Sequence, residues 1–260
     1  MTYAQAVVLG VVQGLTEFLP ISSSGHLILV PHVFGWPDQG LAFDAVMHLG
    51  TLAALFGYFR AELVGMAAGT MSRRVALILL VATIPAGLAG LLFGTVVETS
   101  LRSPLVIACA TALWAIVMWF ADRRSRAPAG DGEALEQITW LQGIAVGAAQ
   151  AIALVPGTSR SGVTITTGLL GGLDRATAAR FSFLLGIPIT AAAGGLKTMQ
   201  LLKAGVPADD FGPLLAALVA AFVSGWFAVW FLVSYLKRRS LTPFVVYRLL
   251  LAAAIVMIAR

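Results

Sequence analysis

Two short stretches of this chain place reactive side chains inside otherwise apolar sequence. The first, VQGLTEFLPISSSGH at residues 12–26, contains Glu17, His26 and a run of serines at 22–24. A membrane interior offers no water to solvate such groups, so ionisable residues at that depth are costly and indicate a functional site. We therefore interpret this stretch as a broken helix with a hydroxyl-rich loop.

The second stretch, ALVPGTSRSGVT at residues 153–164, repeats the first in outline. PISSSG, from Pro20, matches PGTSRSG, from Pro156, when one residue is inserted in the second. Arg160 is the only charged residue between positions 138 and 173. We interpret the two stretches as loops that face each other and form one site. The alternative is a pair of unrelated kinks in a helical bundle.

The residue types in the two loops are those of an anion site. Free N–H groups at a helix start bind anions, and the planar guanidinium of Arg160 matches phosphate oxygens. Gly157 lets the backbone approach a ligand closely. Two such facing sites suit a diphosphate better than a carboxylate or a sulfate. The predicted substrate-binding residues, all from the loops and the helix starts that follow them, are Ser22, Ser24, Gly157, Ser159, Arg160, Ser161 and Thr164.

Further side chains of the first stretch suggest phosphoryl chemistry. His26 can act as a general acid or base near neutral pH, and Ser23 is a candidate nucleophile that a nearby base would activate. Water activated by Glu17 is the competing nucleophile, and the sequence leaves this choice open. Because a bare carboxylate repels phosphate, a divalent cation, Mg²⁺ or Ca²⁺, is expected beside Glu17. Gln13 shares a helix face with Glu17 and would offer the ion a neutral oxygen.

Three polar residues outside the loops are candidates for supporting the site. Asp44 and His48 are four residues apart, so they share one face of a predicted span; His48 is equally well read as a packing histidine. Gln150 lies one helical turn before the second loop. We expect these side chains to lie behind the residues that touch the substrate.

The composition is that of a membrane protein. Of 260 residues, 59% are hydrophobic and only 11% are charged, against roughly 25% charged residues in a soluble domain. The single cysteine, Cys109, excludes an intrachain disulfide and a cysteine metal cluster. The net charge of +5 comes from loop arginines, so it reports topology and contact with anionic lipid and gives no sign of a nucleic-acid partner.

The apolar runs predict an all-α polytopic fold of two similar halves, residues 1–121 and 138–260. Each half begins with a hairpin too short to cross the bilayer twice, at 3–34 and 138–171, which we expect to be re-entrant. A polar linker at 122–137 joins the halves. Six transmembrane helices are expected after the hairpins, three in each half, at residues 41–59, 75–97, 104–121, 178–199, 211–236 and 243–258.

The topology follows from this count of spans. An odd number of spans in each half makes the second structural repeat inverted relative to the first, an arrangement typical of transporters. Basic residues gather on one side, at positions 60, 73, 74, 123, 124, 126 and 237–239, and the positive-inside rule makes that side cytoplasmic. The linker is then cytoplasmic, both termini are periplasmic, and the two loops meet near the middle of the membrane.

The two motifs together resemble one known family. QGLTEFLPISSSGH, from Gln13, and PGTSRSGVT, from Pro156, are similar to undecaprenyl-diphosphate phosphatases of the bacitracin-resistance type. The likeness covers nearly the whole chain, including residues 43–50, 181–188 and the PFVVYR segment at 243–248. It implies hydrolysis of undecaprenyl diphosphate to the monophosphate in the bacterial inner membrane. That reaction recycles the lipid carrier for cell-wall synthesis and confers resistance to bacitracin.

The resemblance also implies particular site residues, a divalent metal and access from the periplasm. Gln13 stands where the family has Glu or Gln, and this neutral version weakens a two-carboxylate metal site. The functional positions that the resemblance implies, in both motifs, are Glu17, Ser23, His26, Ser159, Arg160 and Thr164.

Two other classes of membrane protein share some of these sequence features. Lipid phosphatases of the phosphatidic-acid type also carry Ser-Gly-His, but they need a distant histidine after their Ser-Arg, and no histidine follows Arg160. A transporter or flippase of an anionic polyprenyl phosphate lipid is the alternative, because inverted repeats and broken helices suit transport. The sequence leaves open the chain-length preference and the oligomeric state, a homodimer included.

Overall fold

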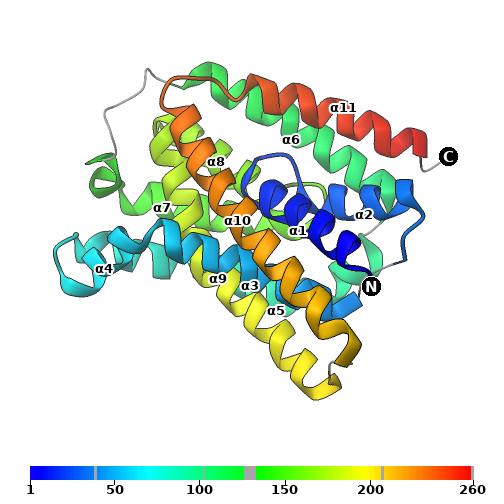
Figure 1. The fold of residues 1–260 in the computed structure, drawn as a ribbon. Coiled ribbons are helices and arrows are strands. Elements are labelled where there is room, and N and C mark those ends of the chain that lie inside the picture. The colour runs from blue at the N-terminus through cyan, green and yellow to red at the C-terminus, as the bar shows by residue number, and fades with distance from the viewer. Residues whose placement is uncertain (38–39, 102, 126–132, 206–207, 259–260) are drawn as a thin grey trace.

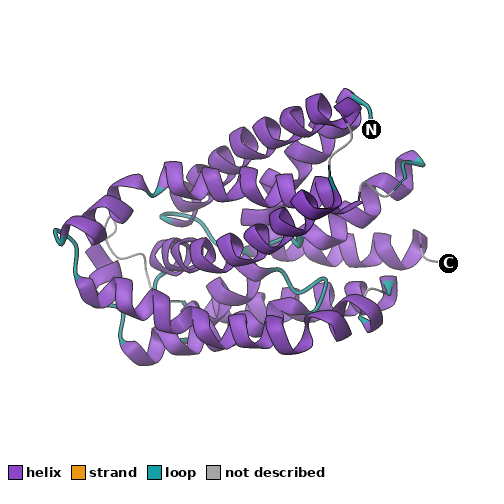
Figure 2. Cartoon of the chain, turned by 90° about the horizontal axis from the view of Figure 1, so that it is seen from below, coloured by secondary structure: helices purple, strands orange, loops and turns teal. Residues whose placement is uncertain are grey.

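The protein is helical throughout the parts of the chain that the structure describes. The computed structural model describes residues 1–37, 40–101, 103–125, 133–205 and 208–258. Within these ranges there are helices, turns and loops but no β-strand (Figure 2). The prediction of an all-α fold is therefore confirmed.

Four of the described helices are long and apolar enough to cross a membrane, so the chain is a multi-pass membrane protein. They are α5 (Arg73–Ser100), α6 (Pro104–Arg124), α9 (Arg175–Ala204) and α10 (Phe211–Leu236). The apolar helices α3 (Gly40–Tyr58) and α11 (Thr242–Ile258) have 19 and 17 residues, close to the roughly 20 residues that a bilayer requires. The short helices α4 (Arg60–Ala68), η1 (Glu133–Gln137) and η3 (Ala208–Asp210) connect these elements.

Each half of the chain begins with short helices joined by a polar loop. The first hairpin consists of α1 (Tyr3–Phe18) and α2 (Ser23–Phe34). The second consists of α7 (Trp140–Gln150), the 3-10 turn η2 (Ala151–Leu154) and α8 (Arg160–Leu170). At 1.5 Å per residue none of these helices exceeds about 24 Å, which is shorter than the hydrocarbon core of about 30 Å.

The hairpins are exchanged between the two halves. α1 lies along α10 of the second half, and α7 lies along α5 of the first half (Figure 1). Glycines permit both approaches: a Cβ on Gly10 would meet the carbonyl of Ala217, and a Cβ on Gly147 would meet that of Ala82. Likewise α3 packs on α9, and α6 packs on α11. The exchange brings the two polar loops together.

Aromatic packing fixes the end of α1, where the first loop begins. Phe18, the last residue of α1, is fully buried and packs edge-to-face on Phe183 of α9, with ring centroids 5.6 Å apart. Phe59, which follows α3, is also fully buried and lies against Phe183. The residue next to Phe18 is Glu17, so this cluster fixes the backbone from which the carboxylate projects.

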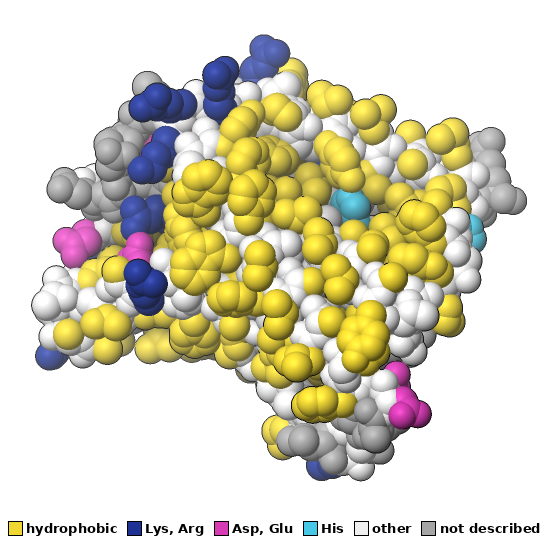
Figure 3. Space-filling model, viewed as in Figure 1, with side chains coloured by type: hydrophobic (Ala, Val, Ile, Leu, Met, Phe, Trp, Pro, Cys, Tyr) yellow, Lys and Arg dark blue, Asp and Glu magenta, His cyan; other side chains and the backbone are white. Residues whose placement is uncertain are grey.

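Positive charge collects at one end of the molecule (Figure 3). At this end Asp122 of α6 pairs with Arg175 of α9 at 2.6 Å and accepts the Leu241 N–H at 3.1 Å. The N-terminus and the C-terminal end of α11 lie at the opposite end (Figure 1). The exposed arginines that follow or begin helices at the charged end are Arg60, Arg73, Arg74, Arg123, Arg124, Arg238 and Arg239.

Candidate functional site

The two loops have the same backbone geometry where each enters its second helix. Ser22 precedes α2 with φ +74° and Ser159 precedes α8 with φ +68°, and they are the only non-glycine residues with positive φ in the described ranges. Each such conformation costs on the order of 1 kcal/mol and is typical of functional sites. The hydroxyl groups match as well: Ser22 and Ser24 Oγ are 3.2 Å apart, and Ser159 and Ser161 Oγ are 3.3 Å apart.

The structure aligns the two hairpins without an insertion. The same offset along the chain relates Gln13 to Gln150, which both lie buried near the end of a hairpin's first helix, and Ser22 to Ser159. The sequence match had paired the loop prolines and inserted one residue in the second loop. The backbone shows that the prolines are out of register by one, because the left-handed serines and the helix starts define the correspondence.

Hydrogen bonds run in both directions between the loops. The Gly157 N–H donates to Ser24 Oγ at 3.1 Å, and Ser161 Oγ donates to the Leu19 carbonyl at 3.3 Å. Ser24 and Ser161 occupy corresponding positions, each two residues after the positive-φ serine of its hairpin. Each of these hydroxyl groups bonds to the backbone of the other loop. The prediction that the loops face each other agrees with this geometry.

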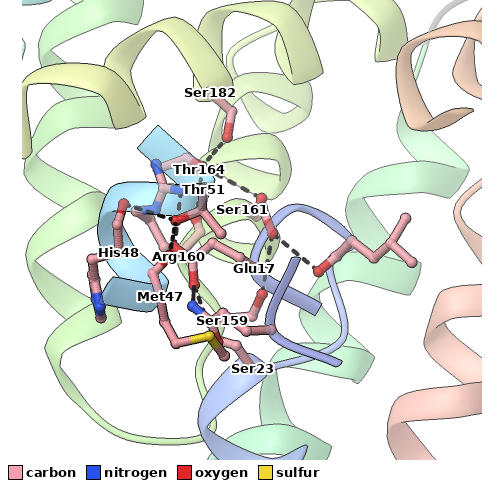
Figure 4. Close-up of polar contacts among 12 residues, drawn as sticks. Glu17, Ser23, Met47, His48, Thr51, Ser159, Arg160, Ser161, Thr164 and Ser182 are labelled. Carbon is pink, nitrogen blue, oxygen red and sulfur yellow. Dashed lines mark hydrogen bonds and ion pairs between the residues drawn. The ribbon is translucent and has the colours of Figure 1, made fainter. Parts of the chain in front are cut away.

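Two of the predicted catalytic side chains, Ser23 and Arg160, meet at a third, Glu17 (Figure 4). Its Oε2 accepts from Ser23 Oγ at 3.1 Å and from Gln13 Nε2 at 3.2 Å, and its Oε1 accepts from Arg160 Nη2 at 3.1 Å. The Glu17 and Arg160 side chains are only 14% and 13% exposed, so their charges are little screened by solvent. One carboxylate therefore connects a serine of the first loop to the arginine of the second.

Several buried polar atoms around Glu17 have no partner in the structure. They are Gln13 Oε1 and the Nε and Nη1 atoms of Arg160. Leaving a buried polar atom unpaired costs about 1–3 kcal/mol, and more for a charged group. Arg160 Nη1 packs against Gly186 of α9, where a Cβ would overlap it, so Gln13 Oε1 and Arg160 Nε are the atoms left for a bound polar ligand.

His26 is held away from this cluster by two hydrogen bonds. Its Nδ1 lies 2.7 Å from the Ser22 carbonyl, and its Nε2 lies 2.6 Å from the hydroxyl of Tyr247 on α11. Because a carbonyl only accepts, Nδ1 carries the proton, and in the neutral ring Tyr247 donates to Nε2. In the sequence, only the family-like PFVVYR segment at 243–248 indicates that Tyr247 belongs to the site. A catalytic role for His26 stays a prediction.

The residue after Tyr247 was also missed as a site residue. Arg248 is fully buried, and its guanidinium donates to four backbone carbonyls at 3.0–3.3 Å. An arginine in the apolar run of the last helix was the signal that could have found it. The four carbonyls belong to Thr111 of α6, Pro20 of the first loop, and Gly157 and Thr158 of the second.

Gly157 is required at its position for two reasons. Its φ of +93° is in the region that favours glycine. A Cβ there would also collide with the Ile107 carbonyl of α6. Its own carbonyl is held by Thr111 Oγ1 at 3.1 Å as well as by Arg248. The close approach that requires glycine is thus made to α6, and the predicted approach to a ligand stays a prediction.

The other predicted residues lie around this centre. Thr164 points its hydroxyl at Ser182 of α9 at 2.6 Å and at the Arg160 carbonyl at 2.7 Å, so it supports the start of α8. Gln150 is buried with both amide atoms unpartnered. The His48 side chain points away from Glu17 (Figure 4). The side chain of Asp44 lies outside the described residues.

The donor set suits a divalent cation that is bound mainly by substrate. No group of three His, Cys, Asp or Glu side chains that could hold a metal occurs in the described part of the chain. Mg²⁺ is commonly held by one or two carboxylates together with substrate phosphates and water. Glu17 and the unpartnered Oε1 of Gln13 fit that pattern, and they are the residues that would hold the ion.

Comparison with known proteins agrees with the geometry. Residues 6–254 match the family model described as bacitracin resistance protein BacA. The chain is 47% identical to undecaprenyl-diphosphatase 2 of Stutzerimonas stutzeri, over 99% of this chain and 98% of the relative. It is 44% identical to the undecaprenyl-diphosphatase of Saccharophagus degradans, over 98% and 97% of the two chains. The chain therefore belongs to the bacitracin resistance protein BacA family.

Proposed function

We propose that this protein hydrolyses undecaprenyl diphosphate to undecaprenyl phosphate and inorganic phosphate. The observation that carries the proposal is Glu17, held 3.1 Å from Ser23 of the first loop and 3.1 Å from Arg160 of the second. One carboxylate joins a candidate nucleophile to a phosphate-binding group. The names of the relatives support the choice of substrate. Release of the monophosphate recycles the lipid carrier for cell-wall synthesis, and the family description associates this activity with resistance to bacitracin.

Arg160 binds the terminal phosphate in this proposal. Its Nε is buried without a partner in the structure, and Nε–H forms a planar fork with the adjacent Nη2–H, which bonds Glu17 here. This fork matches two phosphate oxygens once phosphate replaces Glu17. Arg160 begins α8, so the free N–H groups of that helix start add positive potential. Ser159 and Ser161 supply hydroxyl groups beside it, and Ser22 and Ser24 do the same in the first loop.

Hydrolysis proceeds through Ser23 and Glu17. When phosphate takes Arg160, Glu17 is released to accept the proton of the Ser23 hydroxyl. The Ser23 oxygen forms a bond to the terminal phosphorus, and the bond to the bridging oxygen breaks, with its electron pair leaving on undecaprenyl phosphate. Water then attacks the phosphoserine, Glu17 returns the proton to the Ser23 oxygen, and phosphate leaves. Direct attack by water gives the same products without phosphoserine.

A divalent cation, Mg²⁺ or Ca²⁺, is the expected cofactor. It would sit beside Glu17 and Gln13 and neutralise charge on the diphosphate oxygens. The positions of the protein groups support this choice, because Gln13 Oε1 is buried without a partner next to the carboxylate.

The proposed membrane arrangement has six spans and two re-entrant hairpins in two inverted repeats, residues 1–121 and 138–260. Six helices fit this count when α3 and α11 are included, and the exchanged hairpins support the repeat. The arginine-rich end would face the cytoplasm of a bacterial inner membrane with the linker at 122–137, and the termini and the site entrance would face the periplasm. Cysteine labelling in the linker tests this; labelling from the periplasm would contradict it.

Phosphate release by the purified protein tests the proposed activity. In detergent with Mg²⁺ and undecaprenyl diphosphate, the full chain should release phosphate, and the Glu17→Gln variant should not. Release by neither would contradict the proposal and favour the alternative of lipid transport, because a transporter cleaves no bond. Trapping of phosphate on Ser23 in a quenched reaction would separate the serine from water as nucleophile.

A further inference from the structure

The buried guanidinium of Arg248 differs from the nearby guanidinium of Arg160 in its partners. Arg160 pairs with Glu17, whereas Arg248 forms no ion pair with any residue that the structure describes and bonds only to backbone carbonyls. Burying a charge is costly unless it is fully hydrogen-bonded, so an apolar side chain would fill this space at lower cost. The arrangement calls for a role in the site that an apolar residue could not fulfil.

Arg248 contacts both loops at once from the side of α11. Nη1 donates to the Pro20 carbonyl of the first loop at 3.3 Å, and Nη2 donates to the Gly157 and Thr158 carbonyls of the second at 3.0 Å. Nε donates to the Thr111 carbonyl of α6 at 3.2 Å, which ties the group to a spanning helix. A planar guanidinium with five fixed donors can hold several acceptors in set directions, and a lysine ammonium cannot.

These bonds also orient the peptide groups of the second loop. In a trans peptide the C=O and N–H bonds point in opposite directions. Because the Thr158 carbonyl points at Arg248, the N–H of Ser159 points away from it. Ser159 is the left-handed residue at the start of α8, beside Arg160. The N–H groups at this helix start are those that would receive a phosphate.

We propose that Arg248 is a positioning residue that sets the spacing of the two loops and turns the Ser159 N–H toward the bound phosphate. The part concerning phosphate rests on the proposed function. Through the loops Arg248 keeps Ser23 and Arg160 within reach of Glu17, and it does so without touching the substrate. Misplacing a reacting group by about 1 Å can cost on the order of 100-fold in rate.

The test combines hydrogen exchange with kinetics on the full chain in detergent. Arg248→Lys keeps the positive charge but loses the planar guanidinium with its fixed donors, and Arg248→Met removes both. Thr111→Val is the matched control, because its hydroxyl holds only the Gly157 carbonyl of the second loop. The readouts are backbone exchange at residues 18–25 and 155–162, and separate values of kcat and KM for undecaprenyl diphosphate.

We expect Arg248→Lys to speed exchange in both loops and to lower kcat about 100-fold, whereas Thr111→Val should affect exchange in the second loop alone. Unchanged exchange, or a change confined to the second loop, would overturn the inference. If the unmodified protein releases no phosphate, the proposed function fails, and the exchange data still decide whether Arg248 joins the loops. Should Arg248→Met not fold, the lysine variant carries the test.

Discussion

The two loops share a backbone and differ in chemistry. In both loops a serine with positive φ, Ser22 or Ser159, precedes the helix. In both, the hydroxyl of that serine contacts the hydroxyl of the serine two residues later. At corresponding positions the first loop has Ser23 where the second has Arg160, and the first hairpin has Glu17 where the second has Leu154. One hairpin thus carries the carboxylate of Glu17 and the candidate nucleophile Ser23, and the other carries the guanidinium of Arg160.

This difference shows what repetition contributes to the site. A repeated hairpin supplies two helix starts whose N–H groups can face one substrate. With the backbone repeated, different side chains at corresponding positions are enough to give the two loops different chemistry. Ser23 and Arg160 occupy such positions, and both bond to the Glu17 carboxylate. Neither hairpin alone contains both the Glu17–Ser23 pair and a guanidinium.

Replacing Glu17 should have the largest effect. We expect Glu17→Gln to lower kcat by about 10²- to 10⁴-fold, because the amide keeps the shape but cannot take the Ser23 proton. Leu154→Gln makes the corresponding change in the second hairpin and should leave phosphate release nearly unchanged. Recovery of Glu17→Gln at high Mg²⁺ would mean that Glu17 serves the metal rather than the proton transfer.

Replacing Arg160 should rank next. Arg160→Ala is expected to lose about 10²- to 10³-fold in kcat, the range for removal of a group that stabilises transition-state charge. Arg160→Lys should lose most of this as well, because a lysine lacks the bidentate fork. Arg180→Lys, at the Glu62 ion pair outside the loops, is the control. Full activity of Arg160→Lys would contradict bidentate binding and show that Arg160 contributes only its positive charge.

The two buried glutamines offer a comparison with a smaller effect. Gln13→Glu adds a second carboxylate one turn from Glu17, so it should lower the Mg²⁺ concentration for half-maximal activity several-fold. Gln150→Glu makes the same change in the second hairpin, where the residue one turn later is Leu154, and should not lower that concentration. A metal titration with chelated protein measures both. Equal titrations would remove Gln13 and Glu17 from the metal site.

The left-handed serines should differ slightly in their contribution to stability. Ser159 Oγ accepts the Gly162 N–H at 3.2 Å and so caps α8, whereas Ser22 makes no such cap bond to α2. Ser159→Ala should therefore lower the free energy of unfolding by about 1 kcal/mol more than Ser22→Ala. Thermal unfolding in detergent measures the difference, and equal losses would show that the cap bond contributes nothing.

Sequence reasoning located the loops because their residues conflict with an apolar setting. Ser23, Glu17 and Arg160 stood out for that reason, and the structure brings all three together. The all-α class followed from the length of the apolar runs in the same way. Both predictions rest on local features of the sequence, which can be recognised within one short stretch of the chain.

The contacts that join distant segments were harder to predict. Tyr247 contacts His26 of α2, and Arg248 contacts the two loops. These partners lie 90 or more residues away along the chain, and nothing local in α11 indicates them. The exchange of hairpins between halves depends on close helix approach at Gly10 and Gly147. The positions of the predicted spans along the sequence do not indicate which helices pack together. The one-residue insertion expected in the second loop was wrong because the prolines were a weaker guide to register than the backbone.

The most direct test of the claim that the two loops build one site is a double-mutant cycle between Ser23→Ala and Arg160→Lys. Residues that act as one unit give non-additive losses. We predict that the double variant releases phosphate from undecaprenyl diphosphate at about the rate of the slower single variant, since both groups act through Glu17. Losses that multiply fully would mean that the loops act independently, and would contradict the account.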